Sequence, residues 1–430
     1  MLESVLFVNV RLMDPATGLD QLGALLMQDG RIVDMGTALG RPDGAHRIDG
    51  DGAILCPGLV DMRAALGEPG FEYRETIASA ARAAASSGIT TLACLPDSRP
   101  AVDDPAIVRL LRARGEETGS LTILPYGAVT RGCLGIEMAE IGLLQEAGAV
   151  LFSDGQRAIG DARLMRQALS YASGFGVRIA QHPEDPALAQ GGVATEGELA
   201  TRLGLPGIPA AAEAILVARD LRLLALTGGK LHIAHVSTAE AIGLIRIARD
   251  QGLDVTCDTA PPYFDLNENA IGNFRTYAKL SPPLRPEADR LAVCAALADG
   301  TIDAIASDHQ PRDADDKRLP FALATPGGAG LATLLGITLA QVHNNGLPMM
   351  RALALLTCQP ARVLGVEARL ARGAPADLCL FEPERAWQVI AGALPGKAPN
   401  TPFDGRALEG QVIGTWKAGR RVFTWGSAPP

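Results

Sequence analysis

Short apolar runs of β type alternate with Ala- and Leu-rich helical stretches through the middle of this 430-residue chain. Strands that alternate with helices form a parallel sheet covered by helices, because parallel neighbours need a long crossover connection. Eight such units that close on themselves form a (β/α)8 TIM barrel. The sequence predicts this fold for residues 55–365, with strands at about 54–61, 90–95, 121–126, 149–152, 177–181, 230–234, 254–257 and 302–306.

The two ends of the chain have a different pattern from the middle. Residues 1–54 and 366–430 contain short β-type runs that are separated by clusters of turn residues, as is typical of a small antiparallel sheet. We expect both ends to pack together as a small β-sandwich domain beside the barrel. The predicted fold class is therefore α/β, with one barrel domain and a second domain built by both termini.

Charge and composition exclude several classes of function. Acidic residues outnumber basic ones, 48 to 39, and no run of Lys and Arg provides the basic stripe that a nucleic-acid backbone requires. No window of about 18 uninterrupted apolar residues is present, so no membrane span is expected. The seven cysteines lie at least 21 positions apart, which favours reduced, buried thiols in a cytoplasmic protein over a disulfide framework.

The chemistry of such a barrel lies at the carboxyl ends of its strands, so the residues that follow the strands are informative. Two histidines and a carboxylate from three different strands can hold zinc in principle. His232, His46 and His343 are interpreted instead as structural or surface side chains. The polar positions after the predicted strands are Arg63, Asp97, Asp154, His182, His235, Asp258 and Asp308.

Motifs along nearly the whole chain resemble the cyclic-amide hydrolases of the amidohydrolase superfamily. Within that superfamily the resemblance is to dihydroorotases of the kind associated with aspartate carbamoyltransferase. Because the matching stretches occur in order over almost the full length, they are similar to the family in fold as well as in local sequence. These stretches are 57–62, 68–70, 88–91, 181–185, 203–219, 232–238, 282–285, 307–309 and 400–405.

The resemblance implies a metal-bound hydroxide that attacks an amide carbonyl, with ligands at the ends of several strands. The His-x-His pair expected after the first strand is replaced by Arg63 and Ala65. The acidic ligand after the fourth strand aligns with Gly155, although a slip of one residue would place Asp154 there. The resemblance leaves His182, His235 and Asp308 as a remnant set of ligands. Asp308 is also a vestigial catalytic base.

This remnant set is expected to be insufficient for a binuclear metal centre. At most one weakly held zinc ion is expected, and the positive charge of Arg63 opposes even that. The simplest interpretation of Arg63 is a guanidinium that fills the emptied pocket and pairs with Asp308. No cofactor is therefore predicted.

The positions that the resemblance assigns to the substrate have also changed. Gly67 stands where relatives carry an Arg that would clamp a substrate carboxylate. The glycines of a family substrate loop are matched only weakly by Gly327 and Gly328. Further replaced positions are Asp97 for Asn, Ser281 for Asn and Arg312 for His.

Three functions of different classes stay open at this point. The first is a catalytically inactive dihydroorotase-like subunit of pyrimidine biosynthesis that assembles with aspartate carbamoyltransferase in an oligomer. The second is an active zinc-dependent dihydroorotase, or a related cyclic amidase that hydrolyses a C–N bond, with a reduced metal site. The third is a small-molecule binding protein that uses the barrel mouth. Losses at both metal and substrate positions favour the first function.

Overall fold

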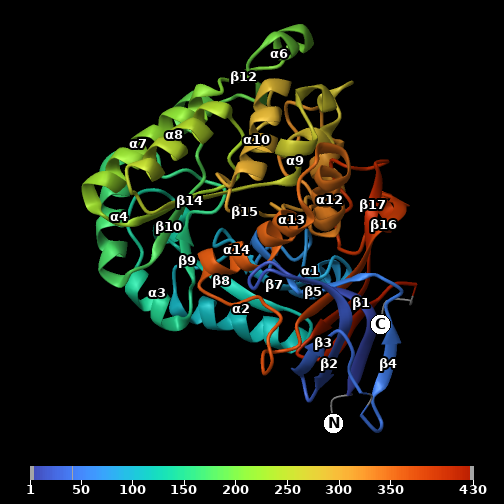
Figure 1. Ribbon diagram of the computed structural model, residues 1–430. Coiled ribbons are helices and arrows are strands. Elements are labelled where there is room, and N and C mark those ends of the chain that lie inside the picture. The colour runs from blue at the N-terminus through green and yellow to red at the C-terminus, as the bar shows by residue number, and fades with distance from the viewer. Residues whose placement is uncertain (1–3, 41, 427–430) are drawn as a thin grey trace.

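A closed ring of parallel strands forms the centre of the protein in the computed structural model, which describes residues 4–40 and 42–426 (Figure 1). The sheet runs in sequence order, and a parallel bridge between Ala64 and His309 joins its first and last edges. This arrangement confirms the predicted TIM barrel. Its strands are β6 (Leu59–Ala64), β7 (Ile89–Cys94), β8 (Thr122–Ala128), β9 (Leu151–Ser153), β10 (Arg178–Gln181), β13 (Lys230–Ile233), β14 (Val255–Thr259) and β15 (Ala304–Ile305).

Helices cover the outside of this ring, and several begin and end at residues that the sequence marks clearly. In α2, Asp104 caps the first turn and accepts a hydrogen bond from the Ala106 backbone, Pro105 starts the helix, and Gly119 ends it in the left-handed region. The helices are α1 (Ile77–Ser86), α2 (Pro105–Thr118), α3 (Ile141–Ala147), α4 (Ala162–Phe175), α5 (Pro186–Ala189), α6 (Glu198–Leu203), α7 (Ala211–Thr227), α8 (Ala239–Asp250), α9 (Pro261–Asp265), α10 (Glu287–Asp299), α11 (Ala314–Arg318), α12 (Leu334–Asn345), α13 (Met349–Leu356) and α14 (Cys358–Leu364).

Both ends of the chain meet in one further sheet of eight strands, visible in Figure 1 as blue and red strands side by side. Its N-terminal and C-terminal parts are joined where β16 pairs antiparallel with β5. The outermost residues of the predicted terminal ranges, 1–3 and 427–430, lie outside the described residues. The strands are β1 (Val5–Asp14), β2 (Leu19–Gln28), β3 (Arg31–Gly36), β4 (His46–Asp49), β5 (Ile54–Pro57), β16 (Leu378–Gln388), β17 (Ala407–Lys417) and β18 (Arg420–Thr424).

The first predicted barrel strand, 54–61, is in fact divided between the two sheets. Residues 54–57 form β5 of the terminal sheet, and the barrel begins with β6 after Gly58. The apolar run is continuous because both strands are fully buried, so its hydrophobicity could not reveal the break. The predicted strand was wrong at this point.

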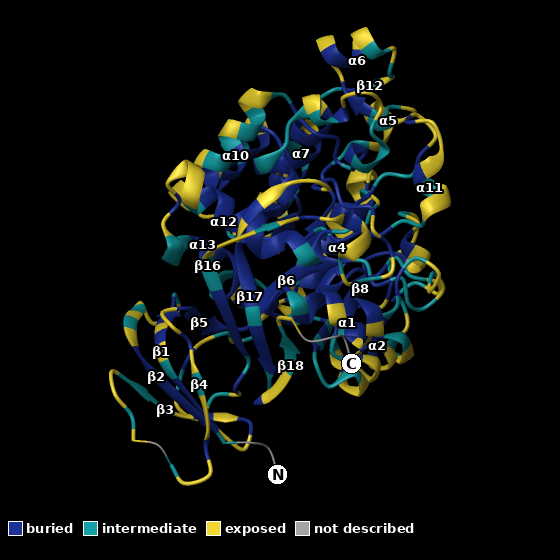
Figure 2. Ribbon diagram, turned by 90° about the vertical axis from the view of Figure 1, so that its right-hand side faces the viewer, coloured by how far each residue is buried: buried dark blue, intermediate teal, exposed yellow. Residues whose placement is uncertain are grey.

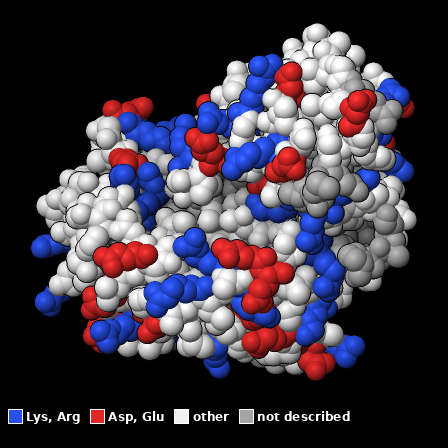
Figure 3. Space-filling model, turned by 90° about the horizontal axis from the view of Figure 1, so that it is seen from below, with Lys and Arg blue, Asp and Glu red and all other residues white. Residues whose placement is uncertain are grey.

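One excursion from the barrel was not predicted. Two short strands, β11 (Ala194–Thr195) and β12 (Gly207–Ile208), pair with each other and carry α6 away from the body of the protein, where Figure 2 shows exposed residues on it. No helix within residues 4–40 and 42–426 is long and apolar enough to cross a membrane. On the face shown in Figure 3, acidic side chains are intermingled with the basic ones.

Candidate active site

Arg63 occupies the centre of the barrel mouth, at the end of β6. Its side chain is buried, and its Nε donates to Asp308 Oδ1 at 3.0 Å. Its Nη2 donates to the backbone oxygen of Gly155 at 3.1 Å, so one guanidinium joins the ends of the first, fourth and eighth strands. The pairing with Asp308 that the sequence predicted is present. Although burial disfavours the charge, the carboxylates of Asp308 and Asp258 raise the pKa of Arg63, which stays protonated.

A chain of hydrogen bonds connects the three remnant ligand positions. His182 Nδ1 lies 2.7 Å from His235 Nε2, and His235 Nδ1 lies 3.2 Å from Asp308 Oδ2. Burial and the nearby Arg63 lower the pKa of His235 to about 4, so its ring is neutral at pH 7 and carries one proton. That proton lies on Nδ1, toward the Asp308 carboxylate, and Nε2 accepts the hydrogen bond from His182.

These contacts decide whether the residues fit the metal that the fold family implies. Both oxygens of Asp308 are already engaged, because Gln310 Nε2 also donates to Oδ1 at 2.9 Å. His182 and His235 each direct a ring nitrogen at the other rather than at a shared point. Among the described residues, no group of three or more His, Cys, Asp or Glu side chains could hold a metal ion. The residues present therefore do not fit a binuclear metal centre.

The backbone nevertheless keeps a strained conformation at two of these positions. His235 has a φ of 34° and Asp308 has a φ of 45°, in the left-handed region that non-glycine residues rarely adopt. Such residues cost roughly 1–3 kcal/mol each and persist where the surrounding fold over-determines them. The fold thus holds both residues in an uncommon backbone conformation.

Two positions that differ from the residues implied by the resemblance, 155 and 97, lie next to each other in the structure. Gly155 has a φ of 69°, and a Cβ atom placed there would lie 2.5 Å from the carboxyl carbon of Asp97. Asp97 thus occupies the space that a side chain at 155 would need. Burial raises the pKa of Asp97, and the positive charge of Arg63 opposes that rise.

Asp154, the alternative acidic ligand that the resemblance leaves open, is directed at the loop that follows β8. Its Oδ1 accepts from the backbone of Val129 at 3.1 Å and of Thr130 at 2.9 Å, and its Oδ2 accepts from Thr130 Oγ1 at 2.5 Å. Three hydrogen bonds to the loop after β8 fix this carboxylate. In this arrangement both of its oxygens are engaged by that loop.

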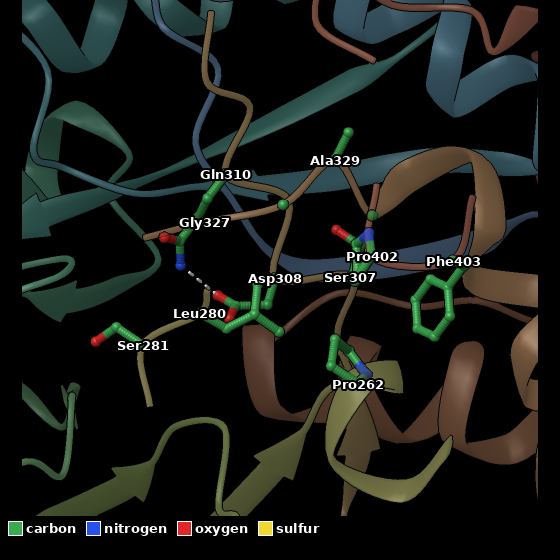
Figure 4. A pocket seen from close by; sticks show the side chains of 12 residues that line it. Pro262, Leu280, Ser281, Ser307, Asp308, Gln310, Gly327, Ala329, Pro402 and Phe403 are labelled. Carbon is green, nitrogen blue, oxygen red and sulfur yellow. Dashed lines mark hydrogen bonds between the residues drawn. The ribbon is translucent and has the colours of Figure 1, made fainter. Parts of the chain in front are cut away.

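Three of the positions related to substrate, Ser281, Gly327 and Gly328, line a small, partly open space (Figure 4). The volume open to water there is ≈ 10 Å³, which is about the room that one water molecule needs. Arg312 lies to one side of it and donates from Nε to the Pro326 oxygen at 2.8 Å. Gly67, in the left-handed region, starts the turn in which its oxygen accepts from Phe71 N at 2.6 Å. The lining includes Ser281, Asp308, Gln310, Gly327, Gly328, Pro402 and Phe403.

The other highlighted positions have structural contacts. The backbone N–H of Ala65 donates to the His309 oxygen at 2.7 Å, and its methyl group offers no ligand atom. His232 points into the barrel between Thr256 Oγ1 at 2.8 Å and Asp258 Oδ2 at 3.0 Å. His46 is exposed on β4, and His343 contacts the Pro383 oxygen through Nε2 at 3.0 Å.

Sequence reasoning missed a second buried ionic cluster, which lies around Glu213 on α7. Its carboxylate accepts from the backbones of Ser237 at 3.0 Å and Thr238 at 2.9 Å, and Arg285 Nη2 lies 3.4 Å away. These residues come from three of the stretches that resemble the family, 203–219, 232–238 and 282–285. A charged residue in two of these stretches, Glu213 and Arg285, was the available signal, but their mutual contact needs the folded barrel.

The barrel and the polar side chains at the carboxyl ends of its strands define the class of protein, an amidohydrolase-type TIM barrel. Solved structures agree with this class. The L-hydantoinase (dihydropyrimidinase) from Arthrobacter aurescens has a TM-score of 0.88 at 23% identity, covering 100% of this chain and 98% of its own. The dihydropyrimidinase from Brevibacillus agri has a TM-score of 0.83 at 22% identity, covering 98% and 95%. These likenesses establish the fold.

Sequence comparison places the chain more closely. A family model described as Dihydro-orotase-like matches residues 52–241. The chain is 44% identical over 421 residues to the protein named Dihydroorotase from Pelobacter propionicus, with 98% of this chain and 99% of that relative covered. It is 39% identical to the Dihydroorotase of Anaplasma phagocytophilum, with 98% and 95% covered. The chain belongs to the dihydroorotase-like family.

Proposed function

We propose that this chain is a non-catalytic member of the dihydroorotase-like family that acts in pyrimidine biosynthesis by assembling with aspartate carbamoyltransferase. The observation that carries the first half of this proposal is the buried guanidinium of Arg63 between Asp308 and the Gly155 oxygen. A fixed positive charge at that point repels a divalent cation and already satisfies the carboxylate that would bind it.

The remaining groups are poorly suited to hydrolysis without a metal. Hydrolysis of a cyclic amide needs an activated water and a base that takes its proton. Burial alone would raise the pKa of Asp308, but His235 and Arg63 together hold it well below its usual range. A carboxylate so strongly stabilised in its charged form is a weak base. The space beside it that is open to water is small, ≈ 10 Å³.

The second half of the proposal, assembly with the transferase in an oligomer, rests on the resemblance and on the contrast between changed site and retained fold. The test is complementation of a strain that lacks this protein, with wild type and with Asp308→Asn, which keeps the shape of the side chain. Equal growth without added pyrimidine is expected. Failure of a variant whose thermal unfolding matches wild type would contradict a non-catalytic role.

A direct test measures the metal content and dihydroorotate turnover of the purified protein, alone and mixed with aspartate carbamoyltransferase. We expect less than one zinc per chain, no turnover by this chain, and co-elution with the transferase on size exclusion. A repair variant, Arg63→His with Ala65→His, provides the matched comparison because it restores the His-x-His pair. If Arg63 excludes the metal, this variant should bind more zinc than wild type.

One observation favours a second candidate, an active dihydroorotase with a reduced metal site. The relatives that match this chain over nearly their whole length carry the name Dihydroorotase. Turnover of dihydroorotate that depends on added zinc, and that is lost in Asp308→Asn, would establish this candidate and remove the first. A complex with the transferase could form in either case, so complex formation alone does not distinguish the two candidates.

A further inference from the structure

Two cysteines that are far apart in the sequence face each other in the terminal sheet. Cys56 in β5 and Cys379 in β16 are direct partners in the antiparallel register. Both residues are fully buried, and both thiols are free. The wide spacing of cysteines along the sequence gave no hint of this pair, because the pairing depends on how the two ends of the chain meet.

The ladder of hydrogen bonds shows which kind of pair they form. Gly58 N donates to the Asp377 oxygen at 2.8 Å, so residues 58 and 377 are a hydrogen-bonded pair. Such pairs alternate with non-bonded pairs along an antiparallel ladder, and therefore 56 and 379, two positions further, are also a hydrogen-bonded pair. The Cα atoms of such a pair lie about 5.5 Å apart. That separation is inside the range of about 4.4–6.8 Å that a disulfide spans.

The two thiols also interact with each other and with the barrel. A hydrogen bond with Cys379, together with burial, raises the pKa of the Cys56 thiol well above its usual value. Both side chains belong to the apolar core that α1 and β7 share with the terminal sheet. Gly88, at the turn between α1 and β7, lies so close to the Cys379 sulfur that a Cβ atom there would be 2.3 Å from it. The pair therefore lies at the seam between the sheet and the barrel.

We propose that Cys56 and Cys379 are a redox modification site, at which a low-molecular-weight disulfide converts the two thiols into a reversible cross-strand disulfide. One protein thiolate attacks a sulfur of the reagent disulfide and releases one reagent thiol. The second protein thiolate attacks the protein sulfur of this mixed disulfide and releases the other reagent thiol. The two protons of the cysteines pass to the two leaving thiolates, the protein is oxidised, and the reagent is reduced. The product links β5 covalently to β16.

Burial determines how readily the two thiols react with a disulfide reagent. The thiolate is the reactive form, and buried thiols in the closed sheet stay protonated and shielded. Exchange therefore needs a transient opening of the pairing between β5 and β16. Once formed, the disulfide holds the N-terminal and C-terminal parts of the sheet together and opposes that opening. The inference is independent of whether the barrel mouth is catalytic.

The experiment incubates the full chain with oxidised glutathione, blocks remaining thiols under denaturing conditions, and digests the protein with trypsin without reduction. A linked pair of peptides is expected, 48–63 and 373–385, which contain Cys56 and Cys379. Two of the seven thiols should be lost, and dithiothreitol should restore both. Seven free thiols after oxidation, a disulfide between other cysteines, or a stable glutathione adduct on either residue would overturn the proposal.

Matched variants separate this pair from the other thiols. Cys56→Ser and Cys379→Ser should each retain all six remaining thiols after the same treatment. Cys133→Ser, which removes a buried thiol elsewhere, should still lose two. If the variants at the seam fail to fold, the peptide map of the wild-type protein decides the question alone.

Discussion

Two buried arginine–carboxylate pairs lie at the carboxyl ends of the barrel strands, and they differ in origin. Arg285 and Glu213, 3.4 Å apart, join stretches that carry the resemblance, whereas Arg63 and Asp308, 3.0 Å apart, include a residue at a position that the resemblance assigns to a metal ligand. In both pairs an otherwise costly buried charge is matched by an opposite charge and by further hydrogen bonds. The first pair connects α7, β13 and the segment before α10, and the second connects β6, β9 and β15.

This difference indicates which family motifs concern the fold and which concern chemistry. The Glu213 cluster needs no metal, so it can persist whatever happens at the barrel mouth. The Arg63 pair supplies a permanent positive charge at a position that the resemblance assigns to a metal ligand. Under the proposed function, Arg63 and Asp308 act in the mouth as a structural cross-link. Four predictions test this comparison.

The largest effect is expected for Glu213→Ala. The substitution leaves Arg285 buried without its partner and removes the acceptor for the backbones of Ser237 and Thr238. Breaking a buried pair in this way costs about 3–5 kcal/mol of unfolding free energy. Urea unfolding measures it, with the exposed Glu240→Ala on α8 as control, for which a change within about 0.5 kcal/mol is expected. A small loss in Glu213→Ala would mean that the cluster contributes little to the fold.

Arg63→Met is expected to have the next largest effect, about 3 kcal/mol, because it leaves the buried Asp308 carboxylate without its cation. The loss is smaller than at Glu213 since His235 and Gln310 still donate to Asp308. The double variant Arg63→Met with Asp308→Asn should recover at least about 1 kcal/mol of it, as measured by a double-mutant cycle. Additive effects would show that the two side chains are not coupled and that the mouth is not cross-linked.

A smaller loss, about 2 kcal/mol, is expected for Gly155→Asp, which restores an acidic residue at the former ligand position. The left-handed φ of 69° disfavours any side chain, and its Cβ would collide with Asp97. Asp97→Ala in the same chain should relieve part of the loss by removing the collision and the like charge. Thermal or urea unfolding of both variants measures this. Full stability of Gly155→Asp alone would contradict the linkage between positions 97 and 155.

Much of this arrangement could be predicted from the sequence, and the rest depends on contacts between distant segments. The periodic alternation of strands and helices located seven barrel strands and part of the first, and the pairing of Arg63 with Asp308 was expected because the resemblance places both residues at an emptied metal pocket. The division of residues 54–61 between two sheets was missed because burial makes both strands equally apolar. The close approach of Asp97 to Gly155, like the Cys56–Cys379 pair, exists only once separate loops or chain ends meet.

The smallest effect is a difference in pH dependence between two buried carboxylates. Asp220, on the retained α7, has its pKa raised to about 6, because burial outweighs the favourable charge of Arg219. Asp308, in the rebuilt mouth, has its pKa lowered because His235 and Arg63 outweigh burial. The folded state therefore holds a proton on Asp220 between about pH 4 and pH 6 that the unfolded state has lost, so this contribution to stability decreases as pH rises through that window. Asp308 contributes in the opposite direction: its stabilisation is present above its unfolded pKa of about 4 and is lost as pH falls further.

Asp220→Asn should remove the first dependence and leave the second. Between pH 4 and pH 6, the unfolding free energy of wild type relative to this variant should fall with rising pH, by no more than about 1.4 kcal/mol per pH unit, which is the limit for one proton. For Asp308→Asn, the unfolding free energy of wild type relative to the variant should instead change only below about pH 4. There the wild type loses the stabilisation of the charged Asp308 carboxylate, which the variant lacks at every pH. Urea titrations at closely spaced pH values distinguish the two slopes. Equal slopes for both variants would mean that His235 and Arg63 do not set the charge state of Asp308 in the mouth, and the contrast between the two regions would then be one of sequence alone.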